Sequence, residues 1–222
     1  MTASLIIAAS EGDSNLYYAC RFMAPDPFVF LEAGGRKMLM MSDLEVDRAR
    51  KQARVDEVLS LSEWEAKAKQ RWAQPRLTDT VSLLLEDYGV ATVEVPADFP
   101  LEAADRLRER GVTVQVRPHP FFPERVVKSA EEVAAIELAQ RHTETALAAA
   151  LDVLRESVIR GDEVVWKGRA LTSEDLKKVV NVSLMENDCI AQHTIIACGE
   201  QGVDPHNQGS GPIRPNQGII FD

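Results

Sequence analysis

The sequence lacks three features that would place it at once in a broad class of proteins. Its three cysteines, Cys20, Cys189 and Cys198, have neither CxxC spacing nor a compact Cys/His cluster, which argues against a disulfide framework or a structural zinc site. No run approaches the ~20 apolar residues of a membrane span. With 25 basic and 35 acidic residues, the formal net charge of −10 argues against nucleic acid as a partner. We therefore expect a cytoplasmic protein with reduced thiols that binds neither membrane nor nucleic acid.

Several familiar motifs are missing as well. There is no Gly-rich phosphate-binding motif. Ser210 lies between two glycines, but the G-x-S-x-G elbow is absent and no ordered Ser, Asp and His triad is found. The apolar N-terminus has no basic n-region and runs into Glu11 and Asp13, so it predicts a first core strand and not a signal peptide.

What is present is an ordinary globular composition, with 45% hydrophobic and 27% charged residues in 222. Up to about residue 120, short β-branched runs alternate with amphipathic stretches, which predicts an α/β fold with a mixed sheet. Gly34-Gly35 predicts a hairpin turn. The expected strands are 28–31, 37–41, part of 55–61, 90–95 and 112–116, and the expected helices are 43–54, one or two within 62–88, and 101–110.

A second domain is expected after Pro118, Pro120 and Pro123, which punctuate the chain. We divide the sequence into residues 1–122 and 123–222. In the second part, the S-x-x-E spacing from Ser129 to Glu132 predicts a capping box that opens a long helix. The other predicted elements are a helix from Thr172, a strand over 189–198 and a last strand over 219–222.

The candidate chemistry lies near residue 222. Asp222 follows an apolar strand, and His206 lies in the polar loop that precedes this strand. A carboxylate at the end of a buried strand, facing a loop with a histidine, can present a metal ligand beside a substrate-binding group. We interpret His193 as a packed or edge histidine of the 189–198 strand, while His119 in the linker and His142 on the long helix suggest no catalytic partner.

The ordered set of motifs resembles the two-domain metallopeptidases of the Xaa-Pro aminopeptidase, prolidase and creatinase group. The segments that carry the resemblance are Asn15-Leu16-Tyr17-Tyr18, Val127 to Glu132, Leu171-Thr172-Ser173, Thr194 to Gly199, Pro205-His206, and Arg214 to Asp222. The resemblance covers nearly the whole chain. It implies a creatinase-type N-terminal domain followed by the first half of a pita-bread catalytic domain, within an α/β (α+β) fold.

The resemblance also implies a site with two divalent metal ions, with manganese preferred over cobalt or zinc, and a homodimer that hydrolyses the bond before proline in short peptides. Of the five metal ligands, only the first can be carried over, onto Asp222. His206 matches the histidine that lies beside the metals and helps to bind substrate. The resemblance thus implies that the chain ends after the first metal-ligand Asp. Because one carboxylate cannot hold a metal pair, we expect this chain to be an inactive fragment that binds no metal stably.

Two alternatives remain open at this point. The chain could be a non-catalytic binding or dimerisation module that uses its N-terminal domain. Within the enzymes, a creatinase-like amidinohydrolase that needs no metal is the main competitor. The residues that would distinguish a peptidase from an amidinohydrolase lie outside this sequence.

Overall fold

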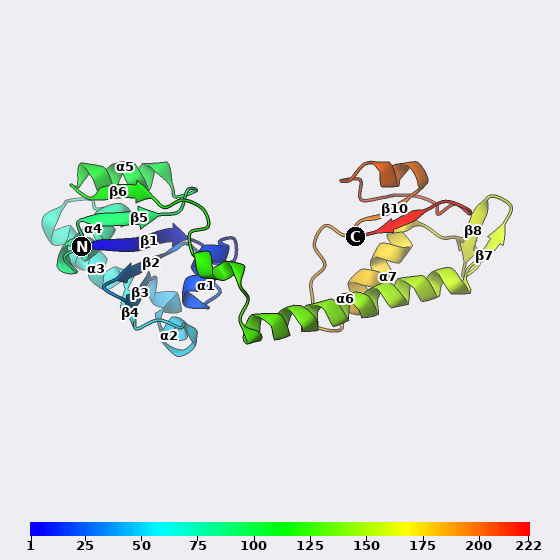
Figure 1. Cartoon of the computed structure of the whole chain (residues 1–222), viewed down its shortest axis with the longest axis horizontal. Helices are drawn as coiled ribbons and strands as arrows, with labels where there is room; N and C mark the ends of the chain where they lie inside the picture. Colours follow the sequence, from blue (N-terminus) through cyan, green and yellow to red (C-terminus); the bar gives the residue numbers. More distant parts are fainter. The chain divides into compact units, whose positions relative to one another are not determined.

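A six-stranded mixed sheet forms the centre of residues 1–127 (Figure 1). The computed structural model describes residues 1–222, and its spatial order of strands here is β4-β3-β2-β1-β5-β6. The β1–β2 and β2–β3 pairs are antiparallel, whereas the β3–β4, β1–β5 and β5–β6 pairs are parallel. The strands are β1 (Thr2–Ala8), β2 (Phe28–Ala33), β3 (Arg36–Met41), β4 (Glu57–Ser60), β5 (Thr92–Val95) and β6 (Thr113–Val116).

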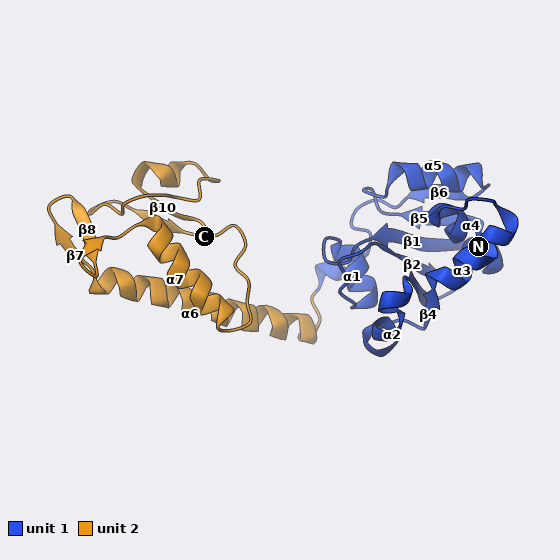
Figure 2. Cartoon of the chain, turned by 180° about the vertical axis from the view of Figure 1, so that it is seen from behind, with its two compact units in different colours: residues 1–127 blue, residues 128–222 orange.

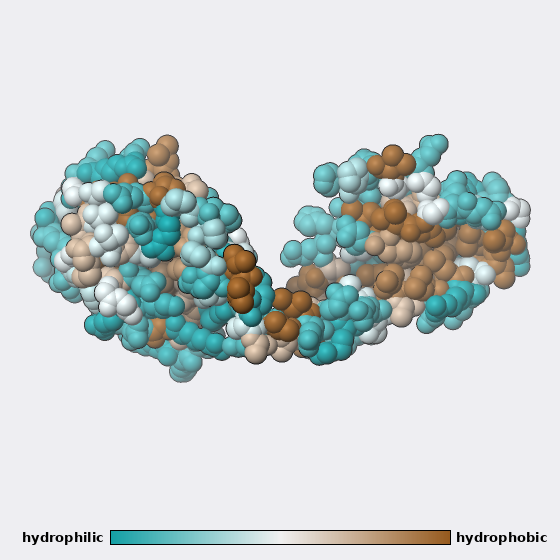
Figure 3. All heavy atoms as spheres, viewed as in Figure 1, coloured by the Kyte–Doolittle hydropathy of each residue, from teal (hydrophilic) through white to brown (hydrophobic).

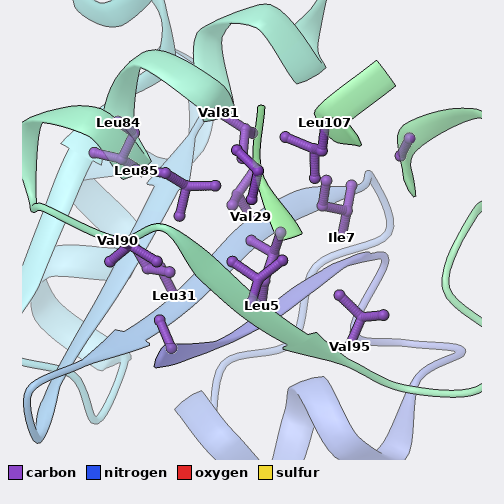
Figure 4. Close-up of a cluster of buried hydrophobic side chains, with 14 of the residues drawn as sticks. Leu5, Ile7, Val29, Leu31, Val81, Leu84, Leu85, Val90, Val95 and Leu107 are labelled. Atoms are coloured by element: carbon purple, nitrogen blue, oxygen red, sulfur yellow. The ribbon is translucent and has the colours of Figure 1, made fainter. Parts of the chain in front are cut away.

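Both faces of this sheet are covered, as the near-continuous apolar sequence of its central strands requires. Side chains alternate along β1, so Leu5 and Ile7 belong to one core cluster and Ile6 to the other. The first cluster packs against α3 (Leu61–Arg71), α4 (Leu77–Asp87) and α5 (Leu101–Glu109), and Figure 4 shows its side chains meeting between sheet and helices. The second packs against α1 (Ser14–Cys20) and α2 (Asp43–Gln52).

The predicted hairpin between β2 and β3 is confirmed. Gly34 and Gly35 have φ angles of 59° and 79°, a left-handed conformation at both central turn positions. Glycine adopts these angles without the steric cost of a Cβ atom, which is why this dipeptide was a readable turn signal. The prediction of a mixed α/β fold is also confirmed.

Residues 128–222 form a second compact unit, coloured orange in Figure 2, and we call residues 1–127 unit 1 and residues 128–222 unit 2. A short 3₁₀ helix, η1 (Pro123–Val126), ends unit 1. In unit 2, α6 (Ala130–Glu156) packs against α7 (Ser173–Met185), and the predicted capping box at Ser129 and Glu132 is present. The remaining elements are β7 (Val158–Arg160), β8 (Glu163–Trp166), β9 (Arg169–Ala170), β10 (Ile196–Cys198), the 3₁₀ helix η2 (Gly199–Val203) and β11 (Ile219–Phe221).

Two sequence predictions for unit 2 are wrong. The strand expected over 189–198 is only three residues long, β10, because its partner β11 spans only three residues and strands form where a ladder partner exists. His193 is consequently not an edge histidine of a strand; it is exposed, in a loop, with a φ angle of 57°. The antiparallel β7-β8-β9 meander was not predicted at all.

No helix of the structure combines the length and the apolar character needed to cross a membrane.

Candidate functional site

The candidate site is built on the antiparallel pair of β10 and β11. Ile196 is paired with Phe221, and Cys198 with Ile219. One step further, Ile195 and Asp222 exchange two backbone hydrogen bonds, with N–O distances of 2.7 and 2.9 Å. The backbone of Asp222 is therefore fixed by the ladder, although its side chain is exposed.

A pocket of about 230 Å³ lies beside Asp222. Its walls are largely apolar and come from four elements or their ends: Thr143, Ala146 and Leu147 of α6, Val180 and Leu184 of α7, Thr194, Ile195 and Ile196 at β10, and Phe221 and Asp222 at β11. Figure 3 shows apolar side chains gathered on the visible face of unit 2, over the region of α7 and β10. A carboxylate at the rim of an apolar hollow is a common arrangement in small-ligand sites.

His206 lies in the loop that follows η2 and is exposed. Its backbone N–H donates to Asp204 Oδ1 at 3.0 Å, and the N–H of Gly209 donates to Asn207 Oδ1 at 2.9 Å. These two Asx turns shape the loop around the histidine. They use the backbone of His206 and leave its imidazole available at the loop surface.

The start of α7 contacts the same loop. Thr172 caps the helix by accepting the N–H of Asp175 at 3.2 Å. Glu174, in the first turn, accepts the N–H of Gly211 with both carboxylate oxygens, at 3.2 and 3.1 Å. The pKa of Glu174 lies below its usual value, first because its own backbone N–H donates to it and then because that of Gly211 does.

The Asp175 carboxylate is the strongly perturbed acid of this region. Arg169 donates to both of its oxygens, and the Thr172 hydroxyl and backbone N–H donate to Oδ2. The hydrogen bonds from Arg169, followed by those from Thr172, lower the pKa of Asp175 to about 2. These contacts explain a helix start and a neighbouring ion pair, so they account for the shift without a role in chemistry.

The structure does not join the two predicted site residues into one centre. No hydrogen bond or ion pair links His206 to Asp222, and His206 is not among the residues that line the pocket beside Asp222. Nowhere do three or more His, Cys, Asp or Glu side chains gather in a way that could hold a metal ion. A two-metal centre needs several carboxylate and imidazole ligands, so the residues of this chain do not by themselves fit a metal pair.

Sequence reasoning missed Glu174 and Lys177, which hold the loop of His206 from α7. The helix start at Thr172 was a readable signal. The sequence did not reveal which loop the first turns of this helix contact, because that loop lies more than thirty residues away. The separations are 31 residues for Lys177 and Gln208 and 37 residues for Glu174 and Gly211.

The chain resembles known proteins at the level of three-dimensional structure. No protein-family model and no curated protein matches the sequence. The structure resembles a prolidase from Pyrococcus horikoshii OT3, with a TM-score of 0.74 and 18% identity over 100% of this chain and 56% of that one. A prolidase from Pyrococcus furiosus gives 0.73 and 16% over 99% and 60%. An X-Pro aminopeptidase from Thermotoga maritima MSB8 gives 0.72 and 16% over 100% and 58%.

These likenesses show that the chain has the fold found in prolidases and X-Pro aminopeptidases. Both units are included in each match, because 99–100% of this chain is covered. The chain spans 56–60% of the length of these three structures.

Proposed function

We propose that this chain belongs to the family of prolidases and Xaa-Pro aminopeptidases, and that it supplies a creatinase-type N-terminal domain, residues 1–122, and the first half of a pita-bread catalytic domain, residues 123–222. The observation that carries the proposal is the match of the whole chain, across both units, to peptidases of this type. A single shared unit would be weaker support, because common folds host many functions. Here two different units occur in the same order.

The proposed substrate class rests on the same structural matches. The neighbours are named as prolidases or X-Pro aminopeptidases, so the substrate proposed here is a short peptide with proline in the second position. The complete protein would carry two divalent metal ions, for which hard carboxylate ligands favour manganese. It would also form a homodimer.

Two residues of this chain have roles in the proposal. Asp222 is proposed as the first metal ligand, because the β10–β11 ladder fixes its backbone while its side chain remains accessible. His206 is proposed to donate a hydrogen bond to bound substrate from the loop surface. Since Asp222 alone cannot hold a metal pair, the chain of 222 residues is proposed to be inactive on its own.

The test begins with the coding sequence beyond codon 222, followed by assay of the complete product and of the 222-residue chain on an Xaa-Pro dipeptide. We expect the complete product to release proline with added Mn²⁺ and to stop when a chelator is added. The 222-residue chain should release none. A folded complete product that cleaves no Xaa-Pro peptide with any divalent metal would contradict the proposal.

Variants of the complete product test the two residues separately. Asp222→Asn should lower kcat/KM by more than about 100-fold, the upper range for disturbing a metal's supporting groups. His206→Ala should cost about 10²–10³-fold in kcat, as loss of a transition-state hydrogen-bond donor does. His193→Ala, at another exposed loop histidine, is the control and should change neither value. Metal-independent hydrolysis of a guanidino substrate would instead favour an amidinohydrolase.

A further inference from the structure

The segment 208–211, just after His206, is held to the body of unit 2 by three separate elements. The N–H of Ile196 in β10 donates to the carbonyl of Gln208 at 3.1 Å. Gln201 of η2 forms a reciprocal pair with Ser210, with its side-chain amide donating to the carbonyl at 3.0 Å and its oxygen accepting the N–H at 2.9 Å. Such density of anchors is unusual for a surface loop, which ordinarily has few contacts with the elements beneath it.

Gly209 makes the contact with β10 possible. It is buried, with a φ angle of 75°. A Cβ atom at this position would lie 1.8 Å from the carbonyl oxygen of Ile196 and 2.8 Å from the Cα of Ala197. Both neighbours are backbone atoms of a paired strand and cannot turn aside as a flexible side chain could. Any residue other than glycine would therefore push the segment away from β10.

Lys177 and Glu174 hold the same segment from α7 with opposite charges. The Lys177 ammonium donates to the carbonyls of Gln208 and Gly209, at 3.1 and 2.8 Å. Glu174 accepts the N–H of Gly211. Charge-assisted hydrogen bonds are stronger than neutral ones, and the partly buried Lys177 is the side chain that bridges two consecutive carbonyls.

We propose that Gly209 and Lys177 are positioning residues for His206: they fix the 208–211 segment on β10 and α7, and so hold the histidine loop in one place relative to β11. The role of His206 rests on the function proposed above, whereas the anchoring itself does not. Rigid support of this kind is what a substrate-binding group needs, because displacement by about 1 Å can cost about a hundredfold in rate.

Amide hydrogen exchange in the 222-residue chain, followed by NMR, tests the anchoring directly. The reporters are the N–H groups of Ile196 and Gly211, which donate into and out of the segment. Lys177→Met should speed their exchange roughly tenfold or more, since charged hydrogen bonds are lost. Lys177→Arg, which keeps the donors, should restore slow exchange. Lys178→Met, at the exposed neighbouring lysine, should have no effect.

Two glycine variants provide a matched second test. Gly209→Ala and Gly211→Ala both place alanine at a positive φ angle, 75° and 73°, but a Cβ at Gly211 has open space around it. We expect Gly209→Ala, but not Gly211→Ala, to speed the exchange of the Ile196 N–H. The strain of a positive φ angle is common to both variants and therefore cannot account for this difference. If Gly209→Ala does not fold, the Lys177 variants decide. Unchanged exchange of Ile196 and Gly211 in Lys177→Met would overturn the proposal.

In the complete product, Lys177→Met should lower kcat by about ten- to a hundredfold with little change in KM, and Lys177→Arg should recover most of it. Faster exchange without a change in kcat would show that the segment is anchored for stability only, which overturns the positioning role. A complete product with no peptidase activity would contradict the proposed function instead, and the exchange data would then decide the anchoring alone.

Discussion

The two units of this chain contain similar kinds of elements but bury very different amounts of apolar side chain. Unit 1 has two core clusters, of twenty and fourteen buried residues, one on each face of its sheet. Unit 2 has a single cluster of eight. Large apolar side chains such as Val182, Met185 and Ile220 are 48%, 72% and 49% exposed in unit 2. Since burial of apolar surface is the main source of stability, unit 1 should be the more stable of the two.

The two units also differ in where they could hold a functional site. The sheet of unit 1 is covered on both faces, and its buried Asp79 carboxylate is paired with Arg110. Unit 2 holds its two-stranded sheet, the pocket beside Asp222 and the His206 loop near the surface. Many proteins combine a stable part with a less stable part that carries the binding site, because binding segments are drawn from the low-stability part of a protein.

The largest expected effect comes from equal truncations in the two cores. Leu5→Ala and Leu171→Ala each remove a side chain that is 0% exposed, at a cost of about 2–5 kcal/mol. We expect Leu171→Ala to unfold unit 2 at 25 °C, because its smaller core leaves little reserve, while Leu5→Ala leaves unit 1 folded. NMR amide protection in each unit is the measurement. Retained protection throughout unit 2 in Leu171→Ala would contradict the comparison.

A smaller effect is expected from the ion pair between the buried Asp79 and the more exposed Arg110 in unit 1. The Asp79 side chain is 3% exposed and accepts hydrogen bonds from Arg110 Nε at 2.9 Å and from the N–H of Arg76. Arg110→Ala leaves this carboxylate short of a partner and should cost about 1–3 kcal/mol in urea denaturation. Arg155→Ala, which removes a 70% exposed partner of Asp152 in unit 2, is the control and should cost nothing measurable.

The pH dependence of unit 2 should expose the Asp175 contact. Its pKa is about 2 in the folded protein against an ordinary 3.8, so the folded state favours the charged form. The stabilisation is complete only well above pH 3.8, and it is lost as the pH falls through 3.8 toward 2. Asp175→Asn should be less stable at neutral pH and should lack this acid-dependent loss. Denaturant titrations from pH 2 to 6, followed by the NMR signals of unit 2, measure this loss of stability. An identical acid slope in the variant would argue against the assignment.

The smallest effect concerns the cap of α6. Ser129→Ala removes the capping box and should cost about 1 kcal/mol locally. Because the first half of α6 is mostly exposed, the result should be faster exchange in its first turns with no shift in the unfolding midpoint. In unit 1, Ser60→Ala, which removes the buried cap of α3 and a partner of Asp43, should shift the midpoint. Equal shifts of the unfolding midpoint in Ser129→Ala and Ser60→Ala would contradict this expected difference between the two helix caps.

Local signals in the sequence predicted much of the fold. The apolar run at the N-terminus that forms β1, the Gly34-Gly35 turn and the Ser129 capping box each depend on residues close together in the chain, and each is present. The strand over 189–198 failed for the opposite reason. Its length is set by β11, more than twenty residues later, and not by its own composition. The β7-β8-β9 meander, with strands of two to four residues, is too short to give a periodic pattern.

The candidate site shows the same division between local and distant causes. The sequence by itself determined that an acidic residue follows an apolar strand at Asp222 and that His206 lies in a polar loop before it. Tertiary structure alone decided that β10 fixes the backbone of Asp222, that α6 and α7 complete a pocket beside it, and that Lys177 and Gly209 hold the histidine loop. The physical reason is that turns and caps are satisfied within a few residues, whereas ladders, pockets and close backbone contacts need atoms from distant parts of the chain.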